Sequence, residues 1–159
     1  MLFLLKTVLL SMTLCCWLAL LPNLTRFATA RAKELAGLTF QTDVVEDSRV
    51  WIVEFFSPMC GSCQEFASIW EKVEANMKSI RAGKINIDDP NGAALAKSLG
   101  VLEEGVPNIR LFNVAGNGKG ISIMNGDTML TGKQIMTKVR SNVLGHDKSG
   151  EGFILKKSL

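Results

Sequence analysis

Between residues 50 and 80 the sequence predicts a buried strand that leads into a long amphipathic helix. Residues 50–56 have the length of a strand and carry β-branched and aromatic side chains on both faces, which is typical of a central strand. Residues 57–59 interrupt this run. From residue 60 to 80, apolar side chains recur at three- and four-residue steps with charged ones between them. This unit favours an α/β fold.

Strand and helix patterns alternate along the rest of the chain. We predict a strand at 84–87, a helix at 93–99, a hairpin of strands at 108–112 and 120–124, and a helix at 131–144. A short strand and helix are expected before them, within residues 38–47. Alternation of strands and helices indicates parallel pairing, and the hairpin adds an antiparallel edge. We therefore expect a central mixed sheet flanked by helices.

Two of the four cysteines lie at the start of the predicted long helix. Cys60 and Cys63 are separated there by Gly61 and Ser62. The free N–H groups and the dipole at a helix N-terminus favour negative charge, so we expect Cys60 to form a thiolate more readily than an ordinary cysteine. Cys63, one turn later, is placed to attack a mixed disulfide on Cys60. The motif indicates redox chemistry of a dithiol.

The remaining composition excludes several other classes of function. His146 is the single histidine, so a His-based catalytic triad or a poly-His metal site has no basis, and two thiolates are too few for a structural zinc site. We expect no metal and no organic cofactor. Without residues 1–30, which carry Lys6 and Arg26 but no acid, the net charge of +3 falls to +1. Such a chain has no basic surface for nucleic acid.

The N-terminal segment is predicted to direct the chain into the secretory pathway. Residues 7–21 are dominated by apolar side chains and lack any charge, and Ala28-Thr29-Ala30 supplies the small residues that a signal peptidase requires. We expect residues 1–30 to be a cleaved signal peptide, with the endoplasmic reticulum lumen or the cell exterior as the location. The alternatives are an uncleaved membrane anchor, the one case in which we expect membrane contact, and an organellar presequence.

The dithiol and its flanks resemble the active-site stretch of thioredoxin-fold proteins, in particular the catalytic domains of protein disulfide isomerases. The sequence there reads Val53-Glu54-Phe55-Phe56-Ser57-Pro58-Met59-Cys60-Gly61-Ser62-Cys63. The resemblance continues through Trp70-Glu71-Lys72, Lys84-Ile85-Asn86-Ile87-Asp88 and Gly105-Val106-Pro107. It implies a thioredoxin fold over residues 38–145. Residues 31–37 would then be a linker and residues 146–159 a flexible tail.

The resemblance also implies roles for individual residues. Cys60 would be the attacking thiol and Cys63 the resolving one. Glu54 would be the buried acid that accepts the proton of Cys63. Lys84 matches the lysine beside that acid, although capping a strand in solvent is an equal alternative. Pro107 matches the cis-proline that faces the dithiol and helps to dock the substrate backbone.

Four further residues are candidates for substrate contact. Gly61 and Ser62 lie inside the motif, and Met59 and Val106 beside it offer an apolar patch for unfolded chains, with ordinary packing as the alternative. Ser62 replaces the histidine of the isomerases and offers a hydroxyl hydrogen bond only.

A second departure from the family pattern lies just before Pro107. The link over residues 100–105 is about two residues longer than the family's usual one. It brings two acids, Glu103 and Glu104, close to the site. We expect this insertion to alter the access of substrates.

We therefore expect a thiol–disulfide oxidoreductase, similar to a protein disulfide isomerase, that forms, reduces or isomerises disulfides in cysteine-containing protein substrates. Glutathione or a partner oxidase or reductase would exchange electrons with it. Two alternatives stay open. One is a redox-weak chaperone or adaptor that binds unfolded chains, and the other is a thioredoxin-like organellar reductase.

Overall fold

The computed structural model describes residues 32–114, 118–143, 147–149 and 152–154. The predicted signal peptide or membrane anchor, residues 1–30, lies outside the described residues. Within the described ranges, no helix is long and apolar enough to cross a membrane.

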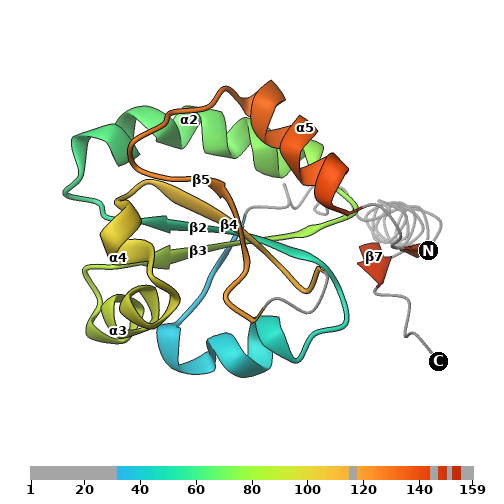
Figure 1. Cartoon of the computed structure of the whole chain (residues 1–159), viewed down its shortest axis with the longest axis horizontal. Helices are drawn as coiled ribbons and strands as arrows, with labels where there is room; N and C mark the ends of the chain where they lie inside the picture. The colour runs from blue at the N-terminus through green and yellow to red at the C-terminus, as the bar shows by residue number, and fades with distance from the viewer. Residues whose placement is uncertain (1–31, 115–117, 144–146, 150–151, 155–159) are drawn as a thin grey trace, which may run out of the picture.

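A five-stranded mixed sheet forms the centre of the molecule (Figure 1). Its strand order is β1-β3-β2-β4-β5, where β3 runs parallel to β1 and β2, and β4 runs antiparallel to β2 and β5. The strands are β1 (Lys33–Glu34), β2 (Trp51–Phe56), β3 (Arg81–Asn86), β4 (Asn108–Phe112) and β5 (Ile121–Met124). The predicted mixed sheet and its antiparallel hairpin are confirmed.

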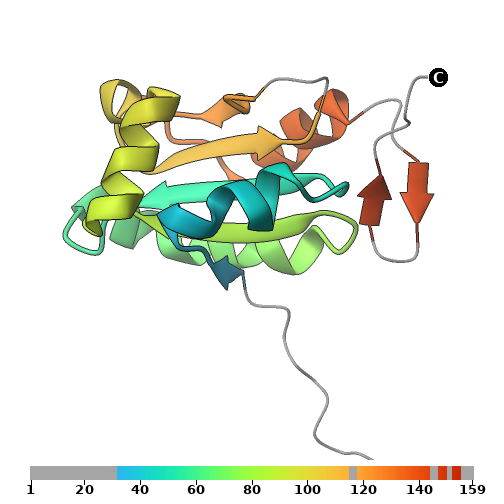
Figure 2. The same ribbon diagram turned by 90° about the horizontal axis from the view of Figure 1, so that it is seen from below.

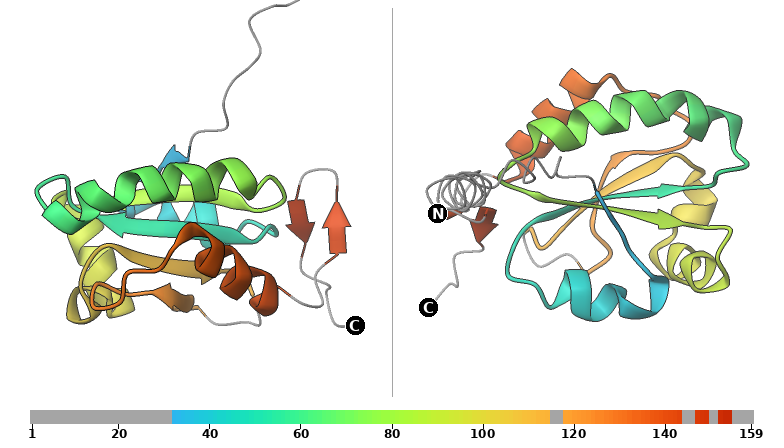
Figure 3. Two further views of the ribbon diagram at one scale, coloured as in Figure 1. Left: turned by 90° about the horizontal axis from the view of Figure 1, so that it is seen from above. Right: turned by 180° about the vertical axis from the view of Figure 1, so that it is seen from behind.

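Helices cover both faces of this sheet (Figures 1 and 2). One face is covered by α2 (Gly61–Asn76) and α5 (Gly132–Asn142). The other is covered by α3 (Pro90–Leu99), α4 (Val101–Glu104) and two short helical segments, η1 (Gly37–Thr39) and η2 (Gln41–Val45). A separate hairpin of β6 (Asp147–Ser149) and β7 (Gly152–Ile154) follows α5 (Figure 3). The flexibility of the tail stays a prediction.

The alternation of side chains along the strands divides the core into two layers. Ile52 of β2 packs into the layer beneath α2 and α5, whereas its neighbours Val53 and Phe55 pack into the layer beneath α3 and η2. Since successive side chains of a strand point to opposite faces, Glu54 lies on the α2 face. This placement brings a carboxyl group beneath the helix that begins with the dithiol.

The start of the domain differs from the prediction. Residues 38–47 contain η1 and η2 but no strand, and the first strand is β1, inside the segment expected to be a linker. Lys33 and Glu34 pair with Gly83 and Lys84 of β3, and Leu35 behind them is buried in the second core layer. The domain therefore begins before residue 38.

Candidate active site

A tight turn carries the chain from β2 to α2 and fixes the position of Cys60. The N–H of Cys60 donates to the carbonyl of Ser57 over 3.1 Å. The Ser57 hydroxyl accepts from the N–H of Met59 and donates to a carboxylate oxygen of Asp88 over 2.9 Å. Cys60 then adopts an extended backbone and serves as the N-cap of α2. The turn thus places the first cysteine at the tip of the helix, as predicted.

The sulfur of Cys60 lies among several polar groups. The N–H of Cys63 donates to it over 3.2 Å, the Ser62 hydroxyl lies 3.1 Å away, and the Val106 carbonyl lies 3.8 Å away. Partial burial raises the pKa of Cys60, but the hydrogen bonds from Cys63 and Ser62 outweigh it and hold that pKa below its ordinary value. Cys60 is therefore suited to act as a thiolate nucleophile.

Cys63 has the opposite environment. Its side chain is buried on the inner face of α2, the face that also carries the buried side chains of Phe66 and Trp70. Burial raises the pKa of Cys63, and the neighbouring Cys60 raises it further. The two thiols therefore differ in both exposure and acidity. This difference is consistent with the prediction that Cys60 at the tip of the helix forms a thiolate and that Cys63 lies one turn later.

Glu54 is a buried carboxyl group on the same face of the sheet as α2. It is 3% exposed, and this burial raises its pKa to about 7, while the charge of Lys84 lowers it and that of Glu74 raises it. Lys84 is the register partner of Glu54 on β3, and its ammonium lies 4.6 Å from the centroid of the Phe56 ring. The structure thus places Lys84 beside Glu54, where its charge acts on the carboxyl group.

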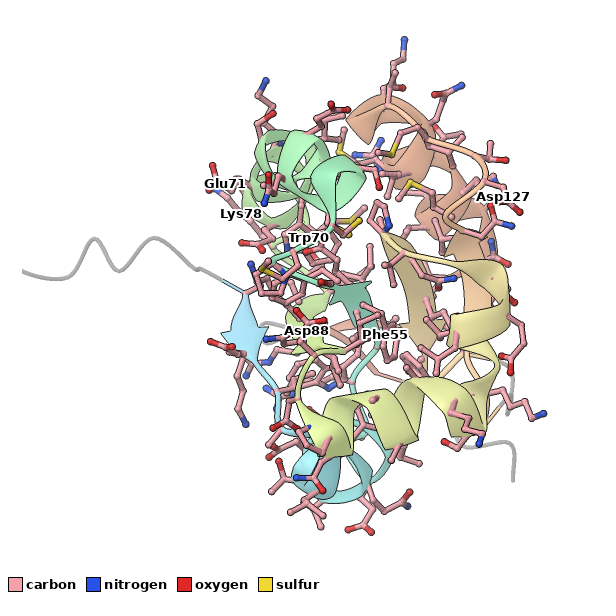
Figure 4. All side chains as sticks on the ribbon, turned by 90° about the vertical axis from the view of Figure 1, so that its left-hand side faces the viewer. Phe55, Trp70, Glu71, Lys78, Asp88 and Asp127 are labelled. Carbon is pink, nitrogen blue, oxygen red and sulfur yellow. The ribbon has the colours of Figure 1, made fainter. Side chains whose placement is uncertain are left out.

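Glu54, Cys63 and Lys84 share a groove of about 1430 Å³ that also borders α2 and β3. Trp70 lines it as well; this side chain points from α2 toward the sheet, whereas Glu71 on the same helix points away (Figure 4). Buried carboxyl groups exchange protons through water more readily when such a groove reaches them. The groove therefore gives Glu54 a route to solvent next to the buried thiol.

The predicted proline segment lies opposite the dithiol. The peptide bond between Val106 and Pro107 is cis, as expected. Pro107 is buried and Val106 is half-buried, with its carbonyl facing Cys60. Backbone groups beside a reactive sulfur can orient an extended peptide.

The other candidate residues surround the exposed side of Cys60. Met59 is 86% exposed, which is unusual for so large an apolar side chain. Gly61 and Ser62 are exposed at the start of α2. Gly61 has nothing within 4 Å of the position that a Cβ would take, so space alone does not require a glycine there. These residues and Val106 lie next to the sulfur of Cys60.

Sequence reasoning missed one polar cluster next to this site. Arg110 of β4 is 4% exposed and forms a 2.8 Å ion pair with Glu104 of α4, and Asn108 donates to the second carboxylate oxygen of Glu104 over 2.9 Å. The acidic insertion was recognised, but its partners were not. The sequence signal that could have predicted the ion pair is the placement of Glu104 just before Gly105-Val106-Pro107 and of Arg110 shortly after it.

Comparisons with known proteins agree with this fold. The family model described as Thioredoxin matches residues 31–140. The chain is 32% identical to the mouse Protein disulfide-isomerase A6 over 85 residues, which cover 53% of this chain and 18% of that protein. It is 41% identical to the Arabidopsis thaliana Protein disulfide-isomerase like 2-2 over 56 residues, or 35% of this chain and 12% of that protein. The match thus spans a small part of each of these relatives.

A solved structure supports the fold independently. The Trx4 domain of ERdj5 superimposes with a TM-score of 0.59 and 23% sequence identity, covering 71% of this chain and 96% of that domain. At 23% identity, this similarity supports the fold alone.

Proposed function

The chain belongs to the thioredoxin family, and we propose that it is a thiol–disulfide oxidoreductase similar to protein disulfide isomerases. Its substrates would be proteins that contain cysteines. The observation that carries this proposal is the asymmetry of the dithiol, in which a half-exposed Cys60 with a lowered pKa precedes a buried Cys63 with a raised one. The relatives named as protein disulfide isomerases support the same activity.

The first step is an attack of the Cys60 thiolate on one sulfur of a substrate disulfide. A bond forms between the Cys60 sulfur and that sulfur, the substrate disulfide breaks, and the other substrate sulfur leaves as a thiolate. The N–H of Cys63 and the Ser62 hydroxyl stabilise the Cys60 thiolate before the attack. The segment Val106-Pro107 and the exposed Met59 would contact the substrate chain around the disulfide.

The second step releases the substrate. Cys63 passes its proton to the Glu54 carboxylate by way of solvent in the groove, and the resulting thiolate attacks the sulfur of Cys60. The mixed disulfide breaks and the second substrate thiolate leaves. The substrate has then gained two electrons, and Cys60 and Cys63 have formed a disulfide. A carboxyl group with a pKa of about 7 can both accept and return this proton at neutral pH.

The reverse sequence would form a disulfide in a reduced substrate. Glutathione, or a partner oxidase or reductase, would return the dithiol to its starting state. We place this activity in the secretory pathway, in the endoplasmic reticulum lumen or outside the cell, because of the apolar N-terminal segment and the small residues at 28–30.

Cysteine variants of the full chain test the proposal directly. The reduced protein should exchange with a peptide that contains one disulfide, C60A should be inactive, and C63A should accumulate as a mixed disulfide with the peptide, detected as added mass. Equal rates for the native chain and C60A would reject the activity. If the C60A/C63A variant still prevented aggregation of unfolded chains while the native dithiol exchanged with nothing, the protein would be a binding module.

A further inference from the structure

An ion pair between a buried arginine and a half-buried glutamate lies beside the segment that faces the dithiol. Arg110 is 4% exposed and lies between Ile109 and Leu111 on β4, on the face away from α2. Its guanidinium donates to a carboxylate oxygen of Glu104 over 2.8 Å and to the carbonyl of Lys119 over 3.0 Å. Glu104 is the last residue of α4, which lies at the same end of the molecule as the start of α2 (Figure 1).

The same carboxylate also accepts a hydrogen bond from the other end of the proline segment. Its second oxygen accepts from the side-chain amide of Asn108, which is fully buried, over 2.9 Å. Glu104 and Asn108 immediately flank Gly105-Val106-Pro107. Burial raises the pKa of Glu104, but hydrogen bonds from Asn108 and the charge of Arg110 outweigh it and keep that pKa below its ordinary value. The Glu104 carboxyl group is therefore ionised at neutral pH.

A second contact supports the segment from behind. The N–H of Gly126, in the turn after β5, donates to the backbone carbonyl of Glu104 over 3.0 Å. A Cβ at Gly126 would lie 2.7 Å from the carbonyl carbon of Gly105 and 2.8 Å from the nitrogen of Val106. The backbone of Gly126 thus packs closely against residues 105 and 106, and the Val106 carbonyl lies 3.8 Å from the sulfur of Cys60.

We propose that Glu104 and Arg110 are positioning residues that hold the Val106 carbonyl and Pro107 opposite Cys60, so that a peptide substrate docks with its disulfide at the nucleophile. This inference rests on the proposed function. Buried ion pairs contribute little net stability compared with apolar packing, because desolvating the charges offsets their attraction. The pair's distinctive effect here is geometric, since it joins α4, the proline segment and β4 at one carboxylate.

The experiment compares two disulfide substrates in the full chain. E104A alone leaves a buried guanidinium without its counter-charge, so the double variant E104A/R110M is the main test. E71A is the control, because Glu71 is an exposed acid that lies on α2, outside the insertion over residues 100–105. The substrates are a peptide that contains one disulfide and bis(2-hydroxyethyl) disulfide, which has no peptide backbone to dock along residues 105–107.

We expect the double variant to lower kcat/KM for the peptide by about tenfold or more, mainly through KM, because a small displacement of a docking group slows reaction strongly. Its rate with bis(2-hydroxyethyl) disulfide and the pH dependence of Cys60 alkylation should match those of E71A. Equal losses with both disulfides, or no loss with the peptide, would overturn the inference. A native chain that exchanges with neither disulfide would instead reject the proposed function, and the inference with it.

Discussion

The backbone N–H of Cys63 donates a hydrogen bond to the Cys60 sulfur over 3.2 Å, so the exposed thiol caps the same helix that buries its partner. One local geometry therefore produces both properties that the proposed reaction needs. The N-cap position leaves the Cys60 sulfur facing free N–H groups, which favour its thiolate. The first helical turn carries Cys63 inward, where burial keeps it protonated.

Removal of the Ser62 hydroxyl should make Cys60 less acidic. The hydroxyl lies 3.1 Å from the sulfur and stabilises the thiolate. Since S62A removes a hydrogen bond that stabilises the thiolate, we expect it to raise the pKa of Cys60. The measurement is the pH dependence of alkylation of the reduced protein. S98A, which removes a hydroxyl from the exposed side of α3, is the control. An unchanged pKa in S62A would show that the backbone N–H alone stabilises the thiolate.

Glu54 should make the stability of the fold fall as the pH rises. Its pKa is 4.5 in an ordinary setting and about 7 in the fold, so the native state binds this proton more tightly than the unfolded state does. The free energy of unfolding should therefore decrease between pH 4.5 and 7, by about 3 kcal/mol in total, because each pKa unit corresponds to about 1.4 kcal/mol.

The variant E54Q removes this titration. We expect E54Q to be more stable than the native chain above pH 7 by about the same 3 kcal/mol and equal to it near pH 4. Urea unfolding at a series of pH values measures the difference. E71Q changes an exposed acid on α2 and should keep the native slope. Parallel curves for E54Q and the native chain would mean that the pKa of Glu54 is the same in the folded and the unfolded chain, and would contradict the prediction.

Met59 should contribute to the recognition of apolar peptides. Its side chain is 86% exposed next to Cys60, and burying it against a substrate would contribute about 1.5 kcal/mol, or about a tenfold change in binding. We expect M59A to raise KM for an apolar disulfide peptide by about that factor and to leave the reaction with glutathione disulfide unchanged, because alanine adds no charge beside Cys60. L38A is the control, because Leu38 is 77% exposed in η1, which packs against α3. Equal effects of M59A and L38A on KM would contradict a specific contact between Met59 and the substrate.

A methyl group at Gly126 should disturb the segment opposite the dithiol. Because the new Cβ would meet the backbone of Gly105 and Val106 at under 3 Å, one of the two loops must shift. We expect G126A to destabilise the fold by about 1–3 kcal/mol, as overpacking does, and to slow exchange with peptides. At Gly118 a Cβ meets nothing within 4 Å, so G118A should leave both quantities unchanged. Native stability and native peptide kinetics in G126A would contradict the close packing of the two loops.

Much of the fold could be predicted because it rests on local patterns. The three- and four-residue recurrence of apolar side chains marks α2, and the two short apolar runs around a glycine-rich turn mark the hairpin of β4 and β5. The acidity of Cys60 follows from its place at a helix N-terminus. Each of these features depends on residues that are close in the sequence.

The features that were missed leave no mark in the local pattern of side chains. Strand β1 has only two residues, both exposed, and exists because β3 offers a free edge to Lys33 and Glu34. No alternation of side chains can mark such a strand. The pair of Glu104 and Arg110 depends on the path of the chain through residues 105–107, which brings the end of α4 next to β4. The sequence shows both charges, but not the path that brings them into contact or the packing that buries Arg110.

The reduction potential of the Cys60–Cys63 pair tests the central claim most directly. The full chain would be equilibrated in graded glutathione buffers, and its free thiols would be trapped and counted by mass. We predict a single two-electron transition at a potential between about −270 mV, as in thioredoxin, and about −180 mV, as in protein disulfide isomerase, because Ser62 supplies only a hydroxyl hydrogen bond to the thiolate. Two thiols that stay free throughout the series would contradict the oxidoreductase account.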